Sequence, residues 1–280
     1  MKTTALLIPT YKRFNDLVNT LKKTYIDDRA KFVIVANLED EELKFINENF
    51  GDRSIIVDER VYGKLGGSNA YNLAFKIAKE NNFDYAILFA DDIIPFNSNW
   101  LDKLYKEFVN TNGKFGIFST DECHIGHYGW NIFLDCPIAH FFIIDCNFLD
   151  QLFLDGFNQY VIDFEIAVRL KESGVDIQLL PIKLNHLRSG LHREFADINY
   201  NSDVEAFLKL YPKYEHSFKV GTNSFFVKHN NKSNFVSQIQ TDGLPIWYNL
   251  KPKGVFIKKV KRKIKAILLR NPFTPKKEEV

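Results

Sequence analysis

The first hundred residues switch repeatedly between two spacings of apolar positions, one typical of buried strands and one of amphipathic helices. Continuous apolar runs predict strands at Ala5–Ile8, Phe32–Ala36, Ser54–Val57 and Tyr85–Ala90. Between them, helical spacing predicts helices around residues 14–25, 43–50 and 70–77. Because parallel strands need crossover connections, this order predicts an α/β fold with a mainly parallel sheet and helices on both faces.

After residue 110 the pattern is less regular. Apolar runs predict further strands at Phe115–Phe118, Ala139–Ile144 and Ile177–Leu184, and a helix is expected from Asp163 to about Ser173, closed by Gly174. Residues 221–250 are rich in Asn, Ser and aromatic residues and have little periodicity. We therefore predict a main domain, residues 1–220, and a C-terminal extension, residues 221–280, packed on it.

The extension differs in charge from the rest of the chain. The net charge is +2, but residues 251–280 hold eleven Lys or Arg and two Glu, a net of +9, which leaves −7 for residues 1–250. Between about residues 254 and 270, apolar and basic positions fall on different faces of a predicted amphipathic helix. Such a helix is typical of binding to an anionic membrane surface. The alternatives are binding to nucleic-acid phosphates, a solvated tail, and a helix packed on the main domain.

Composition sets limits on compartment and class. With 45% hydrophobic and 15% aromatic residues, the chain is not a disordered protein. No apolar run approaches the roughly 18 residues of a membrane span, and the run before Pro9 is shorter than a signal-peptide core. Three cysteines without metal-motif spacing, Cys123, Cys136 and Cys146, indicate reduced thiols. We expect a cytoplasmic protein, with peripheral attachment to the inner face of the membrane as a further expectation.

Two loops after predicted strands exclude common nucleotide-binding motifs. The segment Pro9-Thr10-Tyr11-Lys12-Arg13 lacks the Gly-x-Gly-x-x-Gly turn of a nicotinamide or flavin site. The glycine-rich segment Gly63–Ser68 lacks the Gly-Lys-Ser/Thr ending of a P-loop. A plain loop with Ser68 as a helix cap is at least as good an interpretation of the second segment.

Acidic residues mark two places where chemistry is expected. Asp91 and Asp92 follow the fourth predicted strand directly, and two adjacent carboxylates there favour neutralisation by a divalent cation, with a turn or helix cap as the alternative. Asp163 opens the later helix and is a candidate general base or an N-cap. Glu165 precedes Arg169 by four residues, which predicts a surface ion pair. A histidine, His186, follows a strand-like run and is a packed residue or a ligand.

In this order, the motifs resemble those of the family 2 glycosyltransferases of the GT-A fold. The resemblance covers roughly residues 3–190 and rests on Pro-Thr-Tyr-Lys-Arg, Gly-Gly-Ser-Asn-Ala-x-Asn, Asp-Asp and Asp-x-Glu-x-x-x-Arg-Leu-x-x-x-Gly. It implies a Rossmann-like GT-A domain in residues 1–220 that transfers a sugar from a nucleotide-diphosphate donor, with Mn²⁺ or Mg²⁺ on the diphosphate.

The same resemblance implies roles for individual residues. Asp92 and His186 would bind the metal, and Asp163 would be the catalytic base. The residues implied on the donor side are Pro9, Thr10, Tyr11, Arg13, Glu39 or its neighbour Asp40, Gly67, Asn69 and Asp91. The chain departs from the family at Ala90, where the first acid of the Asp-x-Asp motif is missing, and at Ile162, where the usual acidic neighbour of the base is missing.

The acceptor is expected to be a hydroxyl of a glycan or lipid-linked glycan, such as a lipopolysaccharide or capsule, attacked in one inverting displacement. His127 and Trp130, in a polar and aromatic segment, are candidate acceptor contacts, and Glu165 is a third; ordinary packing is the alternative for the segment. Transfer to a nucleic-acid or protein acceptor is one rival. A nucleotide-sugar-binding module without turnover is the other.

Overall fold

The structure is a computed structural model that describes residues 1–63, 65–120, 127–131, 136–158, 161–187, 196–215 and 224–228, with the backbone alone for residues 120, 127–131, 196–201 and 224–228. The strands are β1 (Thr4–Tyr11), β2 (Ala30–Asn37), β3 (Ser54–Asp58), β4 (Tyr85–Leu88), β5 (Ile93–Pro95), β6 (Phe115–Thr120), β7 (His127–Asn131), β8 (Cys136–Pro137), β9 (Phe142–Asp145), β10 (Ile177–His186) and β11 (Ser224–Lys228). The helices are α1 (Phe14–Lys23), α2 (Asp40–Phe50), α3 (Gly67–Glu80), α4 (Trp100–Glu107), α5 (Ile162–Glu172) and α6 (Ala196–Leu210).

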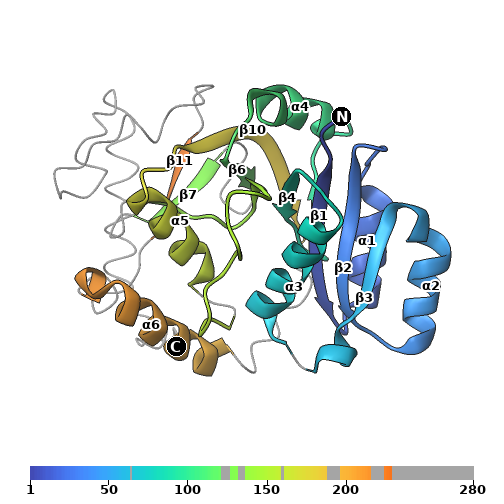
Figure 1. Cartoon of the computed structure of the whole chain (residues 1–280), viewed down its shortest axis with the longest axis horizontal. Helices are drawn as coiled ribbons and strands as arrows, with labels where there is room; N and C mark the ends of the chain where they lie inside the picture. Colours follow the sequence, from blue (N-terminus) through green and yellow to red (C-terminus); the bar gives the residue numbers. More distant parts are fainter. Residues whose placement is uncertain are drawn as a thin grey trace, which may run out of the picture. The chain divides into compact units, whose positions relative to one another are not determined.

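All of these strands belong to one sheet (Figure 1). Its main path runs β11-β7-β6-β9-β4-β1-β2-β3, and β10 joins β5 to β6. The strands β4, β1, β2 and β3 are parallel, as predicted. On the other side of β4 the sheet is mixed, because β9 pairs antiparallel with β4 and with β6, while β10 runs parallel to β6. The strand β11, from the segment set apart as an extension, pairs antiparallel with β7.

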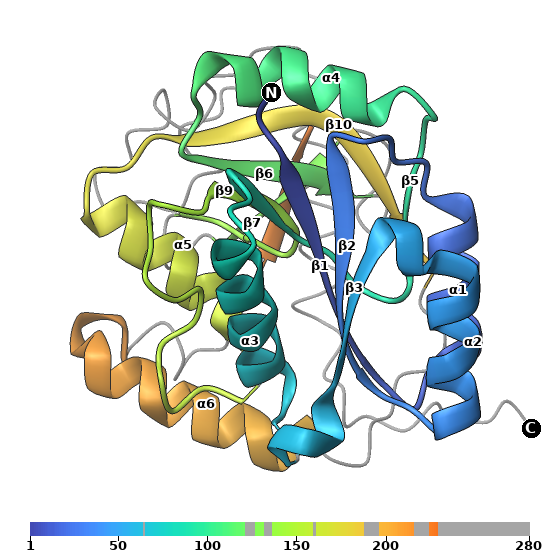
Figure 2. The same ribbon diagram turned by 45° about the vertical axis from the view of Figure 1, so that its right-hand side comes forward.

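Both faces of the central part of the sheet are buried, and neighbouring residues of β1, β2, β4, β6 and β9 enter different cores. On one face Leu6, Ile8, Phe32 and Ile34 pack with α1, α2 and α4. On the other, Leu7, Val33, Leu88, Phe115 and Phe142 pack with α3, α5 and α6. Figure 2 shows α1 and α2 on the opposite side of the sheet from α3, α5 and α6. The predicted α/β class with helices on both faces is confirmed.

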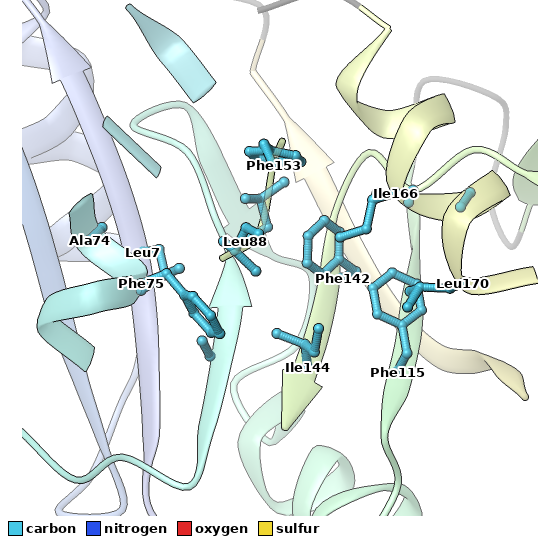
Figure 3. Packing of buried hydrophobic residues seen from close by; sticks show 14 of the residues in the cluster. Leu7, Ala74, Phe75, Leu88, Phe115, Phe142, Ile144, Phe153, Ile166 and Leu170 are labelled. Carbon is cyan, nitrogen blue, oxygen red and sulfur yellow. The ribbon is translucent and has the colours of Figure 1, made fainter. Parts of the chain in front are cut away.

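The second core joins the two halves of the sheet. Phe142 on β9 lies between Phe115 on β6, with ring centroids 4.8 Å apart, and Phe153, at 6.4 Å. Figure 3 shows the Phe142 ring between Leu88 of β4 and Ile166 of α5, with Phe115 beside Leu170. Helix α5, which carries the predicted base, is therefore held by a continuous apolar core.

Several predicted boundaries change. The first strand does not stop before Pro9 but continues to Tyr11, because β2 pairs with it along its whole length. The run Ala139–Ile144 is not one strand, since β9 begins only at Phe142 and the three residues before it form a loop. Helix α5 spans Ile162–Glu172 and is followed by Gly174 at φ 70°, a left-handed conformation that suits glycine.

Within the described ranges, no helix is both long enough and apolar enough to cross a membrane. The predicted basic helix, residues 254–270, lies outside the described residues.

Candidate active site

The two acids at the end of β4 occupy the turn that leads into β5. Asp91 and Asp92 are buried, with 3% and 6% of their surfaces exposed. They lie at the carboxyl ends of the parallel strands, the edge at which open α/β sheets bind ligands. Ile93, the next residue, pairs with His186 on β10, so this strand pairing brings a distant histidine to the acidic turn.

Arg13 neutralises this pair of acids. Its Nη1 lies 2.8 Å from Asp91 Oδ1, its Nη2 lies 2.9 Å from Asp92 Oδ2, and its Nε lies 3.1 Å from Asp16 Oδ2. The guanidinium reaches these carboxylates from the turn between β1 and α1, which begins at Lys12 with φ 54°. The sequence indicated Arg13 as a donor-side residue, but its contact with both acids was not predicted.

Hydroxyl groups complete the environment of Asp91. Thr10 Oγ1 donates to Asp91 Oδ2 at 2.7 Å, and Thr20 Oγ1 donates to the Asp91 carbonyl oxygen at 2.7 Å. Thr10 is buried. Of the two residues predicted to hold the donor at the end of the first strand, Thr10 supports the acidic turn, whereas Tyr11 is 45% exposed.

The two neighbouring acids differ in their proton affinity. Burial raises the pKa of Asp91 to about 6, and the Arg13 charge and the Thr10 hydrogen bond oppose this only in part. Burial acts on Asp92 in the same direction, but hydrogen bonds from His186 and Arg13 outweigh it and lower its pKa. Asp92 is thus the more acidic member of the pair.

His186 and Asp92 form the part of the site that could hold a metal ion. His186 Nε2 lies 3.3 Å from Asp92 Oδ1, and Leu187 N donates to the Asp92 carbonyl oxygen at 2.8 Å. One carboxylate in the acidic turn and one imidazole at the end of β10 are a donor set that fits a divalent cation. Among the described residues no group of three or more His, Cys, Asp or Glu side chains is arranged as a metal site. A cation here would therefore need further ligands, such as phosphate oxygens and water.

Asp163 lies in the first turn of α5, and both of its carboxylate oxygens have partners. Oδ2 lies 2.9 Å from His140 Nε2, and Oδ1 accepts a hydrogen bond from Phe164 N at 3.0 Å. The N-cap of the helix is Val161, not Asp163. Asp163 is thus a first-turn residue with a carboxylate held in place, and 20% of its side chain is exposed.

The backbone at the start of α5 is strained. Val161 has φ 62°, a left-handed conformation that is an outlier for a β-branched residue. Its carbonyl oxygen nevertheless accepts from Glu165 N at 2.8 Å. Strain of this kind persists only where the surroundings fix the backbone, and it is common near functional sites.

Glu165 has a structural environment. The predicted pair with Arg169 is present, with Nε 2.9 Å from Oε1, but Glu165 is fully buried and Tyr211 also donates to it at 3.1 Å. The expectation of a surface pair is wrong because Tyr211, which follows α6, covers it. With no exposed surface, Glu165 does not offer its carboxylate to an acceptor, so that assignment is corrected too.

The acids predicted after the second strand also have structural partners. Glu39 caps α2, accepting from the backbone while Glu42 Oε2 accepts from Glu39 N at 3.0 Å. Asp40 lies 2.6 Å from Arg60 Nη2. Neither residue contacts the acidic turn, but both are exposed at the same edge of the sheet.

The glycine-rich loop begins α3 without a side-chain cap. Gly66, at φ 75°, is the N-cap, and Gly67 is the first helical residue. Ser68 is no cap, because its hydroxyl donates to the carbonyl oxygens of Phe157 and, at 3.0 Å, Asn158. Asn69 is exposed, and its amide nitrogen donates to Leu65 O at 3.0 Å. The loop is thereby joined to the segment that leads towards α5.

The candidate acceptor residues are placed only through their backbone. His127 pairs with Thr120 at one end of β7, and Trp130 pairs with Pro137 of β8. Their side chains lie outside the described residues. Pro9 lies within β1, opposite Val35 of β2.

One residue in contact with a predicted site residue was missed. His140 stands alone as a charged or polar position in the apolar run Ala139–Ile144, and that exception was the only signal in the sequence. Its neighbour Phe141 packs edge-on against His186, with ring centroids 5.7 Å apart. The loop before β9 thus contacts both Asp163 and His186, the histidine next to Asp92.

Comparison with known proteins supports the fold at the level of structure. No protein-family model matches the sequence, and no curated protein matches it. Among solved structures, a mannosyltransferase from Pyrobaculum calidifontis in complex with GDP-Man and Mn²⁺ is similar at a TM-score of 0.54 and 12% identity. The similarity covers 75% of this chain and 64% of that one, so the chain spans less than two thirds of that relative.

A second similar structure is the glucosyl-3-phosphoglycerate synthase from Mycobacterium tuberculosis in complex with Mg²⁺ and uridine-diphosphate. The TM-score is 0.52 at 10% identity, covering 74% of this chain and 79% of that one. The chain therefore has the GT-A fold of nucleotide-diphospho-sugar transferases, as the motifs indicated.

Proposed function

We propose that the chain is a glycosyltransferase that moves a sugar from a nucleotide-diphosphate donor to an acceptor hydroxyl. The observation that carries this proposal is the loop Ala139–Phe141, which contacts two different acidic centres at one edge of a GT-A sheet. His140 contacts Asp163, and Phe141 contacts His186, the partner of Asp92. A site with a buried acid for a charged donor and a more accessible acid for an acceptor suits group transfer between them.

On the donor side, negative charge on the leaving diphosphate has to be stabilised. Asp92 and His186 would hold Mn²⁺ or Mg²⁺, which when bound supplies Lewis-acid stabilisation to a diphosphate. Arg13 stands beside the same carboxylates and adds a fixed positive charge. The exposed Tyr11, at the end of β1, and Asn69, in the first turn of α3, lie at the same sheet edge and are proposed to contact the donor.

On the acceptor side, Asp163 is proposed to take the proton as the acceptor oxygen attacks the anomeric carbon. The O–H bond of the acceptor breaks, a bond to the anomeric carbon forms, and the bond from that carbon to the diphosphate oxygen breaks. A single displacement of this kind inverts the configuration and needs no covalent intermediate.

The acceptor class is proposed from the sequence. A glycan or lipid-linked glycan, such as a lipopolysaccharide or capsule precursor, would suit a chain whose residues 251–280 carry a net charge of +9 and hold the predicted basic helix. That helix would hold the protein on the inner face of a membrane. Co-sedimentation with anionic vesicles, compared with neutral ones, tests this part separately.

The test of the function is a panel of nucleotide sugars with and without Mn²⁺ or Mg²⁺. Binding is measured by calorimetry and turnover by release of the nucleoside diphosphate. A metal-dependent response to one donor is expected and would identify that donor. Binding without turnover would favour the non-catalytic module, and no binding of any donor would overturn the proposal.

A further inference from the structure

The contact between His140 and Asp163 is reinforced by the backbone beside it. While His140 Nε2 lies 2.9 Å from Asp163 Oδ2, the neighbouring Ala139 N donates to the Asp163 carbonyl oxygen at 3.3 Å. Two interactions from adjacent residues therefore tie the loop before β9 to one residue of α5. A lone surface contact between long side chains would have no such support.

The two carboxylate oxygens of Asp163 have partners from two different segments of the chain. Phe164 N, from the helix itself, donates to Oδ1 at 3.0 Å, and His140, from the sheet side, contacts Oδ2. Rotation about the last torsion of an aspartate is broad, so one hydrogen bond alone leaves the carboxylate plane poorly defined. With a partner on each oxygen, the plane is fixed, and each oxygen keeps a further lone pair for an acceptor hydroxyl.

The helix beneath Asp163 is already rigid without His140. Glu165 is fully buried and forms an ion pair with Arg169, whose side chain is 18% exposed. Tyr211 donates to the same carboxylate, and Arg169 Nη2 donates to the Leu152 carbonyl oxygen. The backbone position of α5 therefore does not depend on the histidine. What His140 controls is the orientation of one carboxylate.

His140 is also placed at the accessible side of the pair. Its side chain is 43% exposed, against 20% for Asp163. Removing an imidazole from such a position opens no buried cavity, so a role in overall stability is small. An accessible residue with a well-formed contact to a candidate base is better explained by the chemistry of that base.

We propose that His140 is a positioning residue: by donating a hydrogen bond from Nε2 to Asp163 Oδ2, it holds the carboxylate in the orientation that accepts the proton of the acceptor hydroxyl. The inference rests on the proposed function, in which Asp163 is the base. It adds a residue outside the motifs on which the family resemblance is built. Because a misplacement of about 1 Å can cost roughly 100-fold in rate, a lost orienting contact has a measurable effect.

The experiment compares His140→Leu with His140→Gln, using the donor identified by the nucleotide-sugar panel. The leucine removes the hydrogen-bond donor, whereas the glutamine amide keeps one. Release of nucleoside diphosphate gives kcat and the donor KM, with water as acceptor if no glycan acceptor is known. We expect kcat of His140→Leu to fall about 10- to 100-fold, its donor KM to stay within about twofold, and His140→Gln to recover part of the loss.

Lys114→Gln is the matched control. It removes another partly exposed ion pair from the same sheet, between Lys114 and Asp145, where the side chains are 54% and 13% exposed. The control is expected to keep wild-type kcat, and thermal unfolding checks that all three variants are folded. A folded His140→Leu with wild-type kcat, or a His140→Gln no better than His140→Leu, would overturn the inference while leaving the proposed function standing. Absence of turnover in the wild-type protein would overturn both.

Discussion

The two acidic centres of the site differ in their exposure and in the side chains that contact them. Asp91 and Asp92 have side chains only 5% and 8% exposed and share the Arg13 guanidinium. Asp163 has a side chain 20% exposed and contacts the more exposed His140. The first centre keeps a buried charge balanced before any ligand arrives, and the second keeps a carboxylate oriented and open to solvent. In the proposed function, the first centre would hold charge and the second would accept a proton.

The largest effect is expected when each centre loses its carboxylate charge in turn. Asp163→Asn should lower turnover by about 10²- to 10⁴-fold and leave donor affinity unchanged, because only proton transfer is lost. Asp92→Asn should instead abolish the dependence of donor binding on Mn²⁺. Nucleotide release and calorimetry on both variants separate the two. Unchanged turnover in Asp163→Asn would remove it as the base.

Arg13→Met tests whether the buried centre depends on its own cation. Removing one partner from a buried ion pair costs about 3–5 kcal/mol, and here two carboxylates lose a partner. Urea denaturation without metal is expected to show this loss, and added Mn²⁺ should restore part of it by binding the folded state.

The control for Arg13 is Arg60→Met. Arg60 pairs with Asp40 and Asp58, whose side chains are 87% and 31% exposed, so its loss is expected to lower the free energy of unfolding far less than Arg13→Met does. Equal losses in Arg13→Met and Arg60→Met would show that burial does not distinguish the two arginines.

Glu165→Ala tests the ion pair with Arg169 in α5, the helix that carries Asp163. Arg169 would keep its charge, largely buried, without its acidic partner, so the free energy of unfolding should fall by about 3 kcal/mol. Glu48→Ala breaks an exposed pair with Lys44 at the same helical spacing and should cost less than about 0.5 kcal/mol. If both variants lose the same amount, the buried pair is not a special support of α5.

The smallest effect concerns pH. Burial raises the pKa of Glu165 above its ordinary value of 4.5, while Arg169 and Tyr211 oppose the shift. The folded state therefore holds this proton to higher pH than the unfolded state, and the stabilisation that the proton provides is lost as pH rises from 4.5 through the raised pKa.

Glu165→Gln lacks this titration. Its free energy of unfolding relative to the wild type should improve across that window by on the order of 1 kcal/mol per unit of pKa shift. Urea denaturation at several pH values measures the trend. A relative stability that worsens with rising pH would show that the Arg169 charge outweighs burial.

The sequence predicted best what depends on local pattern. The four parallel strands and the helices between them follow from apolar runs and helical spacing, and the same pattern placed Asp91 and Asp92 at the end of β4. The helix from residue 163 was also predicted to within a residue at its start. In these cases neighbouring residues along the chain decide the structure.

What the sequence missed depends on distant segments. Glu165 and Arg169 have the spacing of a surface pair, but Glu165 is fully buried and accepts a hydrogen bond from Tyr211, more than forty residues later. His140 contacts Asp163 because the loop before β9 lies against the first turn of α5, a helix that begins over twenty residues later in the chain. Arg13 contacts Asp92, which lies 79 residues later in the chain. The spacing of residues along the chain does not predict such contacts.

Strand β4 has a parallel neighbour on one side and an antiparallel neighbour on the other. The segments that build the buried acidic centre precede β4 or follow it closely, apart from His186. The loop and the helix of the centre around Asp163 come after residue 110. Insertions and exchanges in that later part would leave the pairing of β1, β2 and β3 untouched. An architecture divided in this way would allow the proposed donor site to be combined during evolution with many different acceptor sites.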